Sequence, residues 1–373
     1  MELNAVLKAA VDANASDIHL KAGLPPIFRS NSALRPYKAV GRLTPDVLTA
    51  LAEELMNSGQ RDSFERNREI DMGYGVAGLG RFRLNIFQQR GSIGMVFRVI
   101  PTEVKTVRQL ALPKVVETLA EEQRGLILVT GTTGSGKSTT LAAMIDHING
   151  NRTSHVMTIE DPIEFLHRDK KSIINQREVG FDTHSFSGAL KSALRQDPDV
   201  ILVGEMRDFE TIETALVAAE TGHLVLSTLH TVDAGETINR IISVFPPYQQ
   251  KQVRLQLASI IKGIVSQRLV NRADGKGRVP AVEVMVSTSR IRECIESPEK
   301  TKEITTAISE GYTTYKMQTF DQSLLGLLQA KHITYKEALR QSSNPDDLAL
   351  KVSGISSTHD NRWEPFEGQS GKK

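Results

Sequence analysis

Cysteine, tryptophan and long hydrophobic runs are scarce in this sequence of 373 residues. The one cysteine, Cys294, excludes an intramolecular disulfide and a zinc site made only of cysteines, and it fits a reducing compartment. We expect it to be a small core residue. No apolar run approaches the ~18 residues that span a bilayer, and residues 1–10 lack the features of a signal peptide. The sequence therefore predicts a cytoplasmic protein without an integral membrane segment.

An excess of charge of one sign is also missing. The formal net charge is +2, so no global field points to nucleic acid or to an anionic membrane surface. We therefore expect no nucleic-acid partner, although a local basic patch stays compatible with this balance. The length allows two domains at roughly 150 residues each.

The clearest motif is a phosphate-binding loop, or P-loop. The apolar run Leu126–Val129 leads into GTTGSGKS (Gly131–Ser138), and a helix-compatible segment follows. Glycines let the backbone bring several N–H groups and a helix N-terminus onto a polyphosphate. Lys137 is predicted to reach the outer phosphates of ATP or GTP, and Ser138 to bind Mg²⁺. The predicted nucleotide contacts are Thr133, Gly134, Ser135, Gly136, Lys137, Ser138 and Thr139.

Alternation of apolar runs with helical stretches predicts a mainly parallel sheet with helices on both faces. The linker Ile100–Pro113 precedes this region, and we place the domain boundary near residue 105. The stretch Gln249–Leu269 is expected to be helical, and residues 353–373 to be a disordered tail. The expected strands are Leu126–Val129, Val156–Ile159, Val200–Val203, Leu224–Ser227 and Ala281–Val286.

Before the linker, a period of two predicts a β-hairpin from Arg81–Phe87 and Ile93–Val99. A turn centred on Arg90-Gly91 places Arg83 opposite Arg98, and like charges in such a pair destabilise a sheet. An anion held between the two would relieve the repulsion. One interpretation is therefore that Arg83 and Arg98 reach a phosphate; the other is two solvated arginines on an exposed face.

Acids and a histidine follow the apolar runs beyond the P-loop. Glu164 lies after the second run, Glu205 after the third and His230 after the fourth. In a parallel sheet these ends meet at the edge where ligands bind. One acid there can hold Mg²⁺ and another can orient the attacking water, which phosphoryl transfer requires. His223, at the other end of the fourth run, is expected to be structural or to lie at an interface.

Four motifs in this order resemble the secretion ATPase superfamily, and specifically the type IV pilus retraction motors of the PilT/PilU kind. The motifs are the P-loop, TIEDPIEF (Thr158–Phe165), ALRQDPDVILVGEMRD (Ala193–Asp208) and TGHLVLSTLHT (Thr221–Thr231). The resemblance implies an α/β fold with a RecA-like P-loop domain (105–352), preceded by a smaller PAS-like α+β domain (1–104). It also implies a homo-hexameric ATPase that drives pilus retraction and twitching motility.

The resemblance further implies roles for single residues. Glu164 corresponds to the catalytic base, Glu205 to the Walker B acid that holds Mg²⁺ with Ser138, and His230 to the phosphate sensor. Arg83 and Arg98 correspond to arginines that the N-terminal domain contributes to bound nucleotide. The implied partners are an inner-membrane platform protein, which would make the protein peripheral at that membrane, and a paralogous retraction ATPase.

One departure from the family pattern keeps other functions open. The signature AIRNLIRE of the main retraction motor is replaced by RIRECIES (Arg290–Ser297). An accessory subunit or scaffold that hydrolyses little ATP alone is therefore a second hypothesis. A DNA-translocating ATPase of the same superfamily is a third, against which the near-neutral charge argues.

Overall fold

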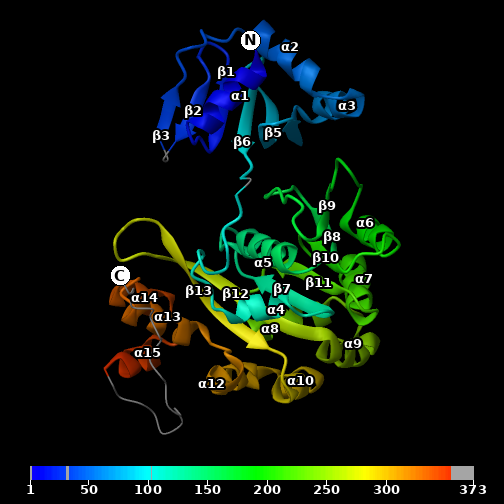
Figure 1. Cartoon of the computed structure of the whole chain (residues 1–373), viewed down its shortest axis with the longest axis vertical. Helices are drawn as coiled ribbons and strands as arrows, with labels where there is room; N and C mark the ends of the chain where they lie inside the picture. Colours follow the sequence, from blue (N-terminus) through cyan, green and yellow to red (C-terminus); the bar gives the residue numbers. More distant parts are fainter. Residues whose placement is uncertain (1, 31–32, 102, 354–373) are drawn as a thin grey trace. The chain divides into compact units, whose positions relative to one another are not determined.

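The computed structural model describes residues 2–30, 33–101 and 103–353, and it divides into two compact units (Figure 1). The N-terminal unit comprises Met1–Glu103 and two later segments, Asp161–His167 and Glu178–His184. The P-loop unit comprises Val104–Glu160, Arg168–Arg177 and Ser185–Lys373. Because two segments from the middle of the sequence belong to the first unit, the chain passes between the units more than once.

The N-terminal unit contains an antiparallel six-stranded sheet in the order β3-β2-β1-β6-β5-β4. Alternate residues of β5 and β6, such as Phe82, Leu84 and Phe97, are completely buried, because the sheet packs one face against the helices. The elements are α1 (Leu3–Asp12), β1 (Asp17–Lys21), β2 (Ile27–Ser30), β3 (Ala33–Pro36), α2 (Pro45–Leu55), α3 (Ser58–Asn67), β4 (Glu69–Val76), β5 (Gly80–Gln89) and β6 (Ser92–Val99).

The P-loop unit contains a seven-stranded sheet in the order β13-β12-β7-β11-β10-β8-β9. Pairing is parallel from β8 through β10, β11 and β7 to β12, and β13 is antiparallel to β12. The predicted α/β fold, with a mainly parallel sheet after a smaller α+β domain, is confirmed. The strands are β7 (Gly125–Thr130), β8 (His155–Glu160), β9 (Ile173–Glu178), β10 (Val200–Val203), β11 (Leu224–Leu229), β12 (Ile261–Asn271) and β13 (Arg278–Val286).

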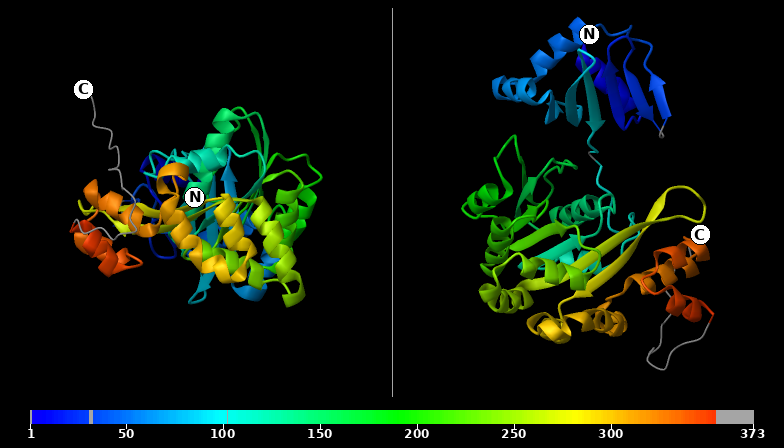
Figure 2. Two further views of the ribbon diagram at one scale, coloured as in Figure 1. Left: turned by 90° about the horizontal axis from the view of Figure 1, so that it is seen from below. Right: turned by 180° about the vertical axis from the view of Figure 1, so that it is seen from behind.

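Helices connect and cover these strands (Figure 2). No helix in the described part of the chain is both long and apolar enough to cross a membrane. The helices of the P-loop unit are α4 (Val115–Ala120), α5 (Lys137–Asn151), α6 (Phe186–Ala193), α7 (Phe209–Glu220), α8 (Ala234–Ser243), α9 (Pro247–Ile260), α10 (Ser289–Glu296), the 3-10 helix η1 (Pro298–Glu303), α11 (Ile304–Glu310), α12 (Tyr312–Tyr315), α13 (Phe320–Gln329), α14 (Tyr335–Gln341) and α15 (Pro345–Val352).

One expectation for the P-loop unit was wrong. The predicted helix Gln249–Leu269 ends at Ile260, and β12 begins at Ile261. β12 is buried on both faces, so its apolar residues at positions 261, 264, 265, 269 and 270 do not alternate with a period of two, and periodicity cannot distinguish the strand from a buried helix. The predicted strand Ala281–Val286 is confirmed as part of β13, which is antiparallel to β12 because a short turn joins the two strands directly.

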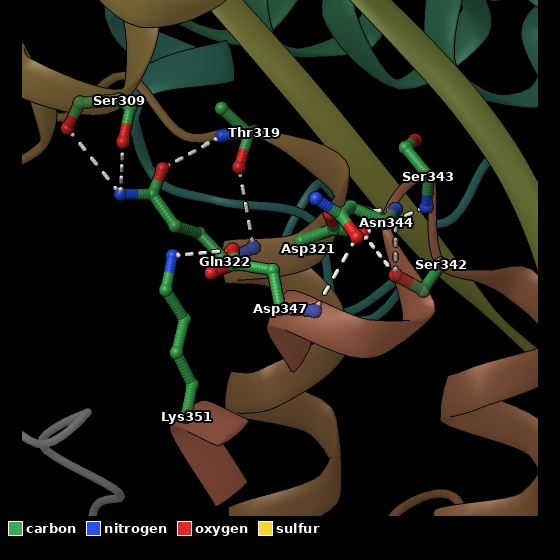
Figure 3. Close-up of polar contacts among 9 residues, drawn as sticks. All are labelled: Ser309, Thr319, Asp321, Gln322, Ser342, Ser343, Asn344, Asp347 and Lys351. Carbon is green, nitrogen blue, oxygen red and sulfur yellow. Dashed lines mark hydrogen bonds and ion pairs between the residues drawn. The ribbon is translucent and has the colours of Figure 1, made fainter. Parts of the chain in front are cut away.

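The C-terminal helices pack on this last hairpin, α13 against β13 and α14 against β12. Asp321 on α13 holds the connection between α14 and α15, because its carboxylate accepts hydrogen bonds from the Ser342 hydroxyl and from the backbone N–H groups of Ser343 and Asn344 (Figure 3). The Arg268 guanidinium lies 3.9 Å from the centre of the Phe320 ring. Of the predicted tail, residues 354–373 lie outside the described residues.

Candidate active site

The P-loop connects a buried strand to a helix, as the motif predicts. All of β7 is buried, and α5 begins at Lys137 directly after the loop. Gly131, Gly134 and Gly136 have φ values of +140°, +78° and +96°, a region that favours glycine. The Lys137 ammonium donates hydrogen bonds to the carbonyl oxygens of Gly131 (2.8 Å) and Thr132 (3.1 Å). The Lys137 side chain therefore lies against the P-loop, where it is predicted to contact the outer phosphates.

Side chains of strand β12 form hydrogen bonds with residues on either side of the P-loop. The Thr130 hydroxyl donates to Ser266, and the Gln267 side chain donates to the Thr140 hydroxyl at 2.9 Å. A Cβ atom at Gly131 would lie 2.5 Å from the Gln267 carbonyl oxygen, so only glycine fits there. Sequence reasoning missed Ser266 and Gln267, because it placed them in a helix. A polar Ser-Gln pair within an apolar run was the available signal.

The residues of the loop fit a bound polyphosphate. The Ser135 hydroxyl is buried and has no hydrogen-bond partner within the described part of the chain, so its hydrogen-bonding capacity is available to a ligand. Thr133 and Gly134 are exposed, whereas Lys137, Ser138 and Thr139 are half-buried at the start of α5. An exposed loop followed by a helix N-terminus presents N–H groups to an anion.

A magnesium site made of protein groups alone is not present among residues 2–30, 33–101 and 103–353, where no three His, Cys, Asp or Glu side chains cluster to hold a metal. Nucleotide-bound Mg²⁺ keeps waters and phosphate oxygens and needs only one or two protein ligands. Ser138 and Glu205 are chemically suited to that role, as a hydroxyl and a carboxylate oxygen donor.

Glu205 and His230 lie together, beyond the ends of the neighbouring strands β10 and β11. One Glu205 carboxylate oxygen lies 3.0 Å from His230 Nε2 and 2.7 Å from Arg207 Nε. Burial would raise the pKa of Glu205, but hydrogen bonds and charge from Arg207 and His230 outweigh it and lower the pKa. Glu205 is therefore ionised at neutral pH. Arg207 was not predicted, although it lies within the GEMRD motif.

The position of His230 follows from strand pairing. β11 lies beside β7, with Leu229 paired to Thr130, and the Gly131 N–H donates to the Leu229 carbonyl oxygen. The first residue of the P-loop is thus bonded to the residue before His230. His223 lies at the opposite end of β11, where its ring contacts the Ala218 carbonyl oxygen at 2.9 Å. This contact agrees with the structural role expected of it.

The other predicted site residues belong to the N-terminal unit. Glu164 is exposed in the segment Asp161–His167 of that unit. A hydrogen bond to Asp71 is the main cause that raises the pKa of Arg83, and the charges of Asp161 and Glu164 also contribute. The structure therefore places Glu164 within electrostatic reach of Arg83.

The predicted hairpin register is confirmed, with Arg83 opposite Arg98. Their repulsion does not require an anion, because carboxylates of the chain itself lie beside both guanidinium groups. Arg83 Nε donates to Asp71 at 2.9 Å, and Arg98 Nε donates to Asp17 at 3.0 Å. A role of either arginine in nucleotide binding consequently needs support from elsewhere.

A P-loop between a buried strand and a helix, with an ionised acid and a histidine beyond adjacent strands, defines the class of the P-loop ATPases. Within this class, the model of the family "Type II/IV secretion system protein" matches residues 1–340. The chain belongs to this family.

Several relatives extend over nearly the whole chain. The type IV pilus retraction ATPase PilT of Pseudomonas aeruginosa is 45% identical over 93% of this chain and 100% of its own length. The type IV pilus ATPase PilU of the same organism is 42% identical over 94% of this chain and 91% of its own. A crystal structure of the pilus retraction motor PilT with bound ADP superposes with a TM-score of 0.85, at 47% identity over 94% of this chain and 99% of that one.

Proposed function

We propose that this protein is an ATP-hydrolysing motor that powers type IV pilus retraction and thereby twitching motility. The observation that carries the proposal is the P-loop with Glu205 and His230 beyond neighbouring strands, in a chain 45% identical to a pilus retraction ATPase over that relative's full length. The related motor was crystallised with ADP, the product of ATP hydrolysis.

In this proposal ATP binds with its phosphates on the P-loop residues Thr133–Thr139. Lys137 neutralises the outer phosphates, and Ser138 and Glu205 hold Mg²⁺, either directly or through its waters. Glu164 acts as the general base for the attacking water, and His230 senses the γ-phosphate through its contact with Glu205. The N-terminal unit supplies Arg83 and Arg98 to the nucleotide of the same or a neighbouring subunit.

We further propose that the motor is a homo-hexamer of two-domain subunits (1–104 and 105–352) that acts at the cytoplasmic face of the inner membrane. Its partner there is the platform protein of the pilus machine. The resemblance to retraction motors supports this arrangement. The chain would be peripheral at the membrane and would transmit force through the ring.

Steady-state phosphate release by the purified chain tests the enzymatic part of the proposal. Lys137→Ala removes the cation on the outer phosphates and Glu205→Ala removes the acid at the metal, so each should lower turnover about 10²-fold or more. Lys191→Ala and Glu210→Ala are matched controls, because these residues form an exposed ion pair with each other in the same unit. Turnover of either site variant near that of the controls would contradict the assignment.

The chain is almost as similar to PilU as it is to PilT, and this favours a second candidate function. The identity is 42%, against 45% for PilT, and both alignments cover more than nine-tenths of the chain. In this alternative the protein binds ATP within a ring that it shares with an active paralogue. Turnover that appears only when the paralogue is added, and that survives Lys137→Ala in this chain, would favour the accessory role.

A further inference from the structure

A buried carboxylate outside the proposed nucleotide site anchors the segment that carries Glu164. Glu178 is the last residue of β9, and its side chain is 4% exposed. One oxygen, Oε2, accepts a hydrogen bond from Arg81 Nη2 at 3.0 Å and another from the backbone N–H of Ile163 at 3.2 Å. Ile163 immediately precedes Glu164. All four residues belong to the N-terminal unit.

The surroundings are shaped to hold this pair. A Cβ atom on Gly73 would lie 2.5 Å from Arg81 Nη2 and 2.8 Å from Glu178 Oε1, so the glycine on β4 makes room for both side chains. The Arg81 guanidinium also lies 5.9 Å from the centre of the Phe181 ring. The backbone of Glu178 is held as well, because its N–H donates to the Asp182 carboxylate at 2.9 Å.

Stability alone does not account for such a pair. Desolvation of two charges offsets most of their attraction, so a buried ion pair adds little over apolar residues of similar volume. This pair does something that apolar residues cannot do. Since a carboxylate has several acceptor sites, Glu178 bonds a strand residue and the backbone of the Glu164 segment at the same time.

We propose that Arg81 and Glu178 are positioning residues that fix the backbone of the catalytic base Glu164 to the sheet of the N-terminal unit. The inference rests on the proposed ATPase function and adds to it residues that touch neither nucleotide nor metal. A general base must lie within hydrogen-bond reach of the proton it abstracts, and a displacement of about 1 Å can cost about 10²-fold in rate. Loss of the anchor should therefore lower kcat and leave ATP binding on the P-loop unchanged.

Glu178→Ala, Glu178→Gln and Gly73→Ala test this in the full-length protein. Glutamine keeps an oxygen that can accept the Ile163 N–H bond, so it should retain more activity than alanine. Gly73→Ala displaces the pair without altering either charge. Gly75→Ala is the matched control, because Gly75 lies two residues further along β4 and a Cβ atom there meets nothing within 4 Å.

Two readouts are needed, amide hydrogen exchange of the segment 161–167 and the separate measurement of kcat and of the dissociation constant of ATP. In Glu178→Ala we expect exchange of this segment to accelerate about tenfold or more, kcat to fall about 10²-fold and the dissociation constant to change less than about twofold. Gly73→Ala should show the same pattern more weakly, and Gly75→Ala should match the wild type.

Each outcome decides between the inference and the function on which it rests. Unchanged exchange of 161–167 in folded Glu178→Ala would overturn the anchoring role whatever the turnover. Faster exchange with wild-type kcat would show a purely structural anchor and would also overturn the inference. Absence of turnover in the wild type, with or without its paralogue, would instead contradict the motor function itself.

Discussion

Glu283 gives the protein a specific pH dependence of stability. Glu283 lies on β13 and is 3% exposed. Its side chain accepts a hydrogen bond from the Ala234 N–H at the start of α8. Burial is the main cause that raises the pKa of Glu283 to about 7, and the charges of Asp233 and Asp321 add to it. The Ala234 hydrogen bond and the Arg268 charge act in the opposite direction.

The sign follows from the two end states. In the unfolded chain Glu283 releases its proton near 4.5, whereas in the folded chain it keeps the proton until about 7. The stabilisation from the protonated form is fully present below the unfolded pKa and is lost as the pH rises through the folded pKa. A change from 4.5 to about 7 corresponds to roughly 3 to 4 kcal/mol at about 1.4 kcal/mol for each pH unit.

Glu283→Gln should remove this dependence, because the amide keeps an acceptor for the Ala234 N–H and cannot ionise. Relative to the wild type, the variant should gain about 2 to 3 kcal/mol of unfolding free energy between about pH 5 and about pH 8. Urea unfolding at several pH values measures this difference.

Glu337→Gln serves as the control for this series. Burial acts to raise the pKa of Glu337, but hydrogen bonds from Arg340 and from the Asn271 N–H outweigh burial and lower this pKa. Its stabilisation is therefore present above the unfolded pKa and is lost only as the pH falls through the lowered pKa, so its difference from the wild type should be constant above pH 5. A Glu283→Gln difference that is equally constant would refute the reasoning about Glu283.

Substitution of the two hairpin arginines should lower protein stability by different amounts but slow ATP hydrolysis to a similar extent. Arg83→Ala and Arg98→Ala should each slow phosphate release roughly 10- to 10²-fold in folded protein. Unchanged kinetics in both would show that the two arginines serve only their ion pairs with Asp71 and Asp17. Arg83→Ala should cost less than about 1 kcal/mol in thermal unfolding, because both members of its pair with Asp71 are about 40% exposed. Arg98→Ala should cost about 1 to 3 kcal/mol, since Asp17 is only 11% exposed and loses a charged donor; an equal cost for both would contradict this ordering.

The fold could be predicted where local patterns are strong. The glycine spacing identified the P-loop, and the alternation around Arg83 and Arg98 gave the hairpin register residue by residue. β12 could not be recognised, because a strand buried on both faces shows no period of two. Nor could the sequence show that Asp161–His167 and Glu178–His184 belong with the N-terminal unit, since that depends on long-range contacts such as the one between Arg81 and Glu178, 97 positions apart.

The candidate site was predictable to a similar extent. Parallel strands alone led to the expectation that Glu164, Glu205 and His230 converge. Glu205 and His230 are 3.0 Å apart, whereas Glu164 lies in a segment of the N-terminal unit. The second partner of Glu205, Arg207, required knowledge of side-chain direction after the strand end. The carboxylates beside Arg83 and Arg98 could not be predicted, because the period-two pattern relates only the two strands of the hairpin, whereas Asp71 and Asp17 come from the strands on either side.

Imaging of single particles of the full-length protein with Mg²⁺ and a non-hydrolysable ATP analogue tests the central claim most directly. We expect a six-membered ring in which the γ-phosphate lies within hydrogen-bond distance of Lys137 Nζ, with Mg²⁺ at Ser138 and the Glu205 and His230 pair beside it. A nucleotide bound away from the P-loop, or a P-loop without nucleotide at saturating analogue, would contradict the account.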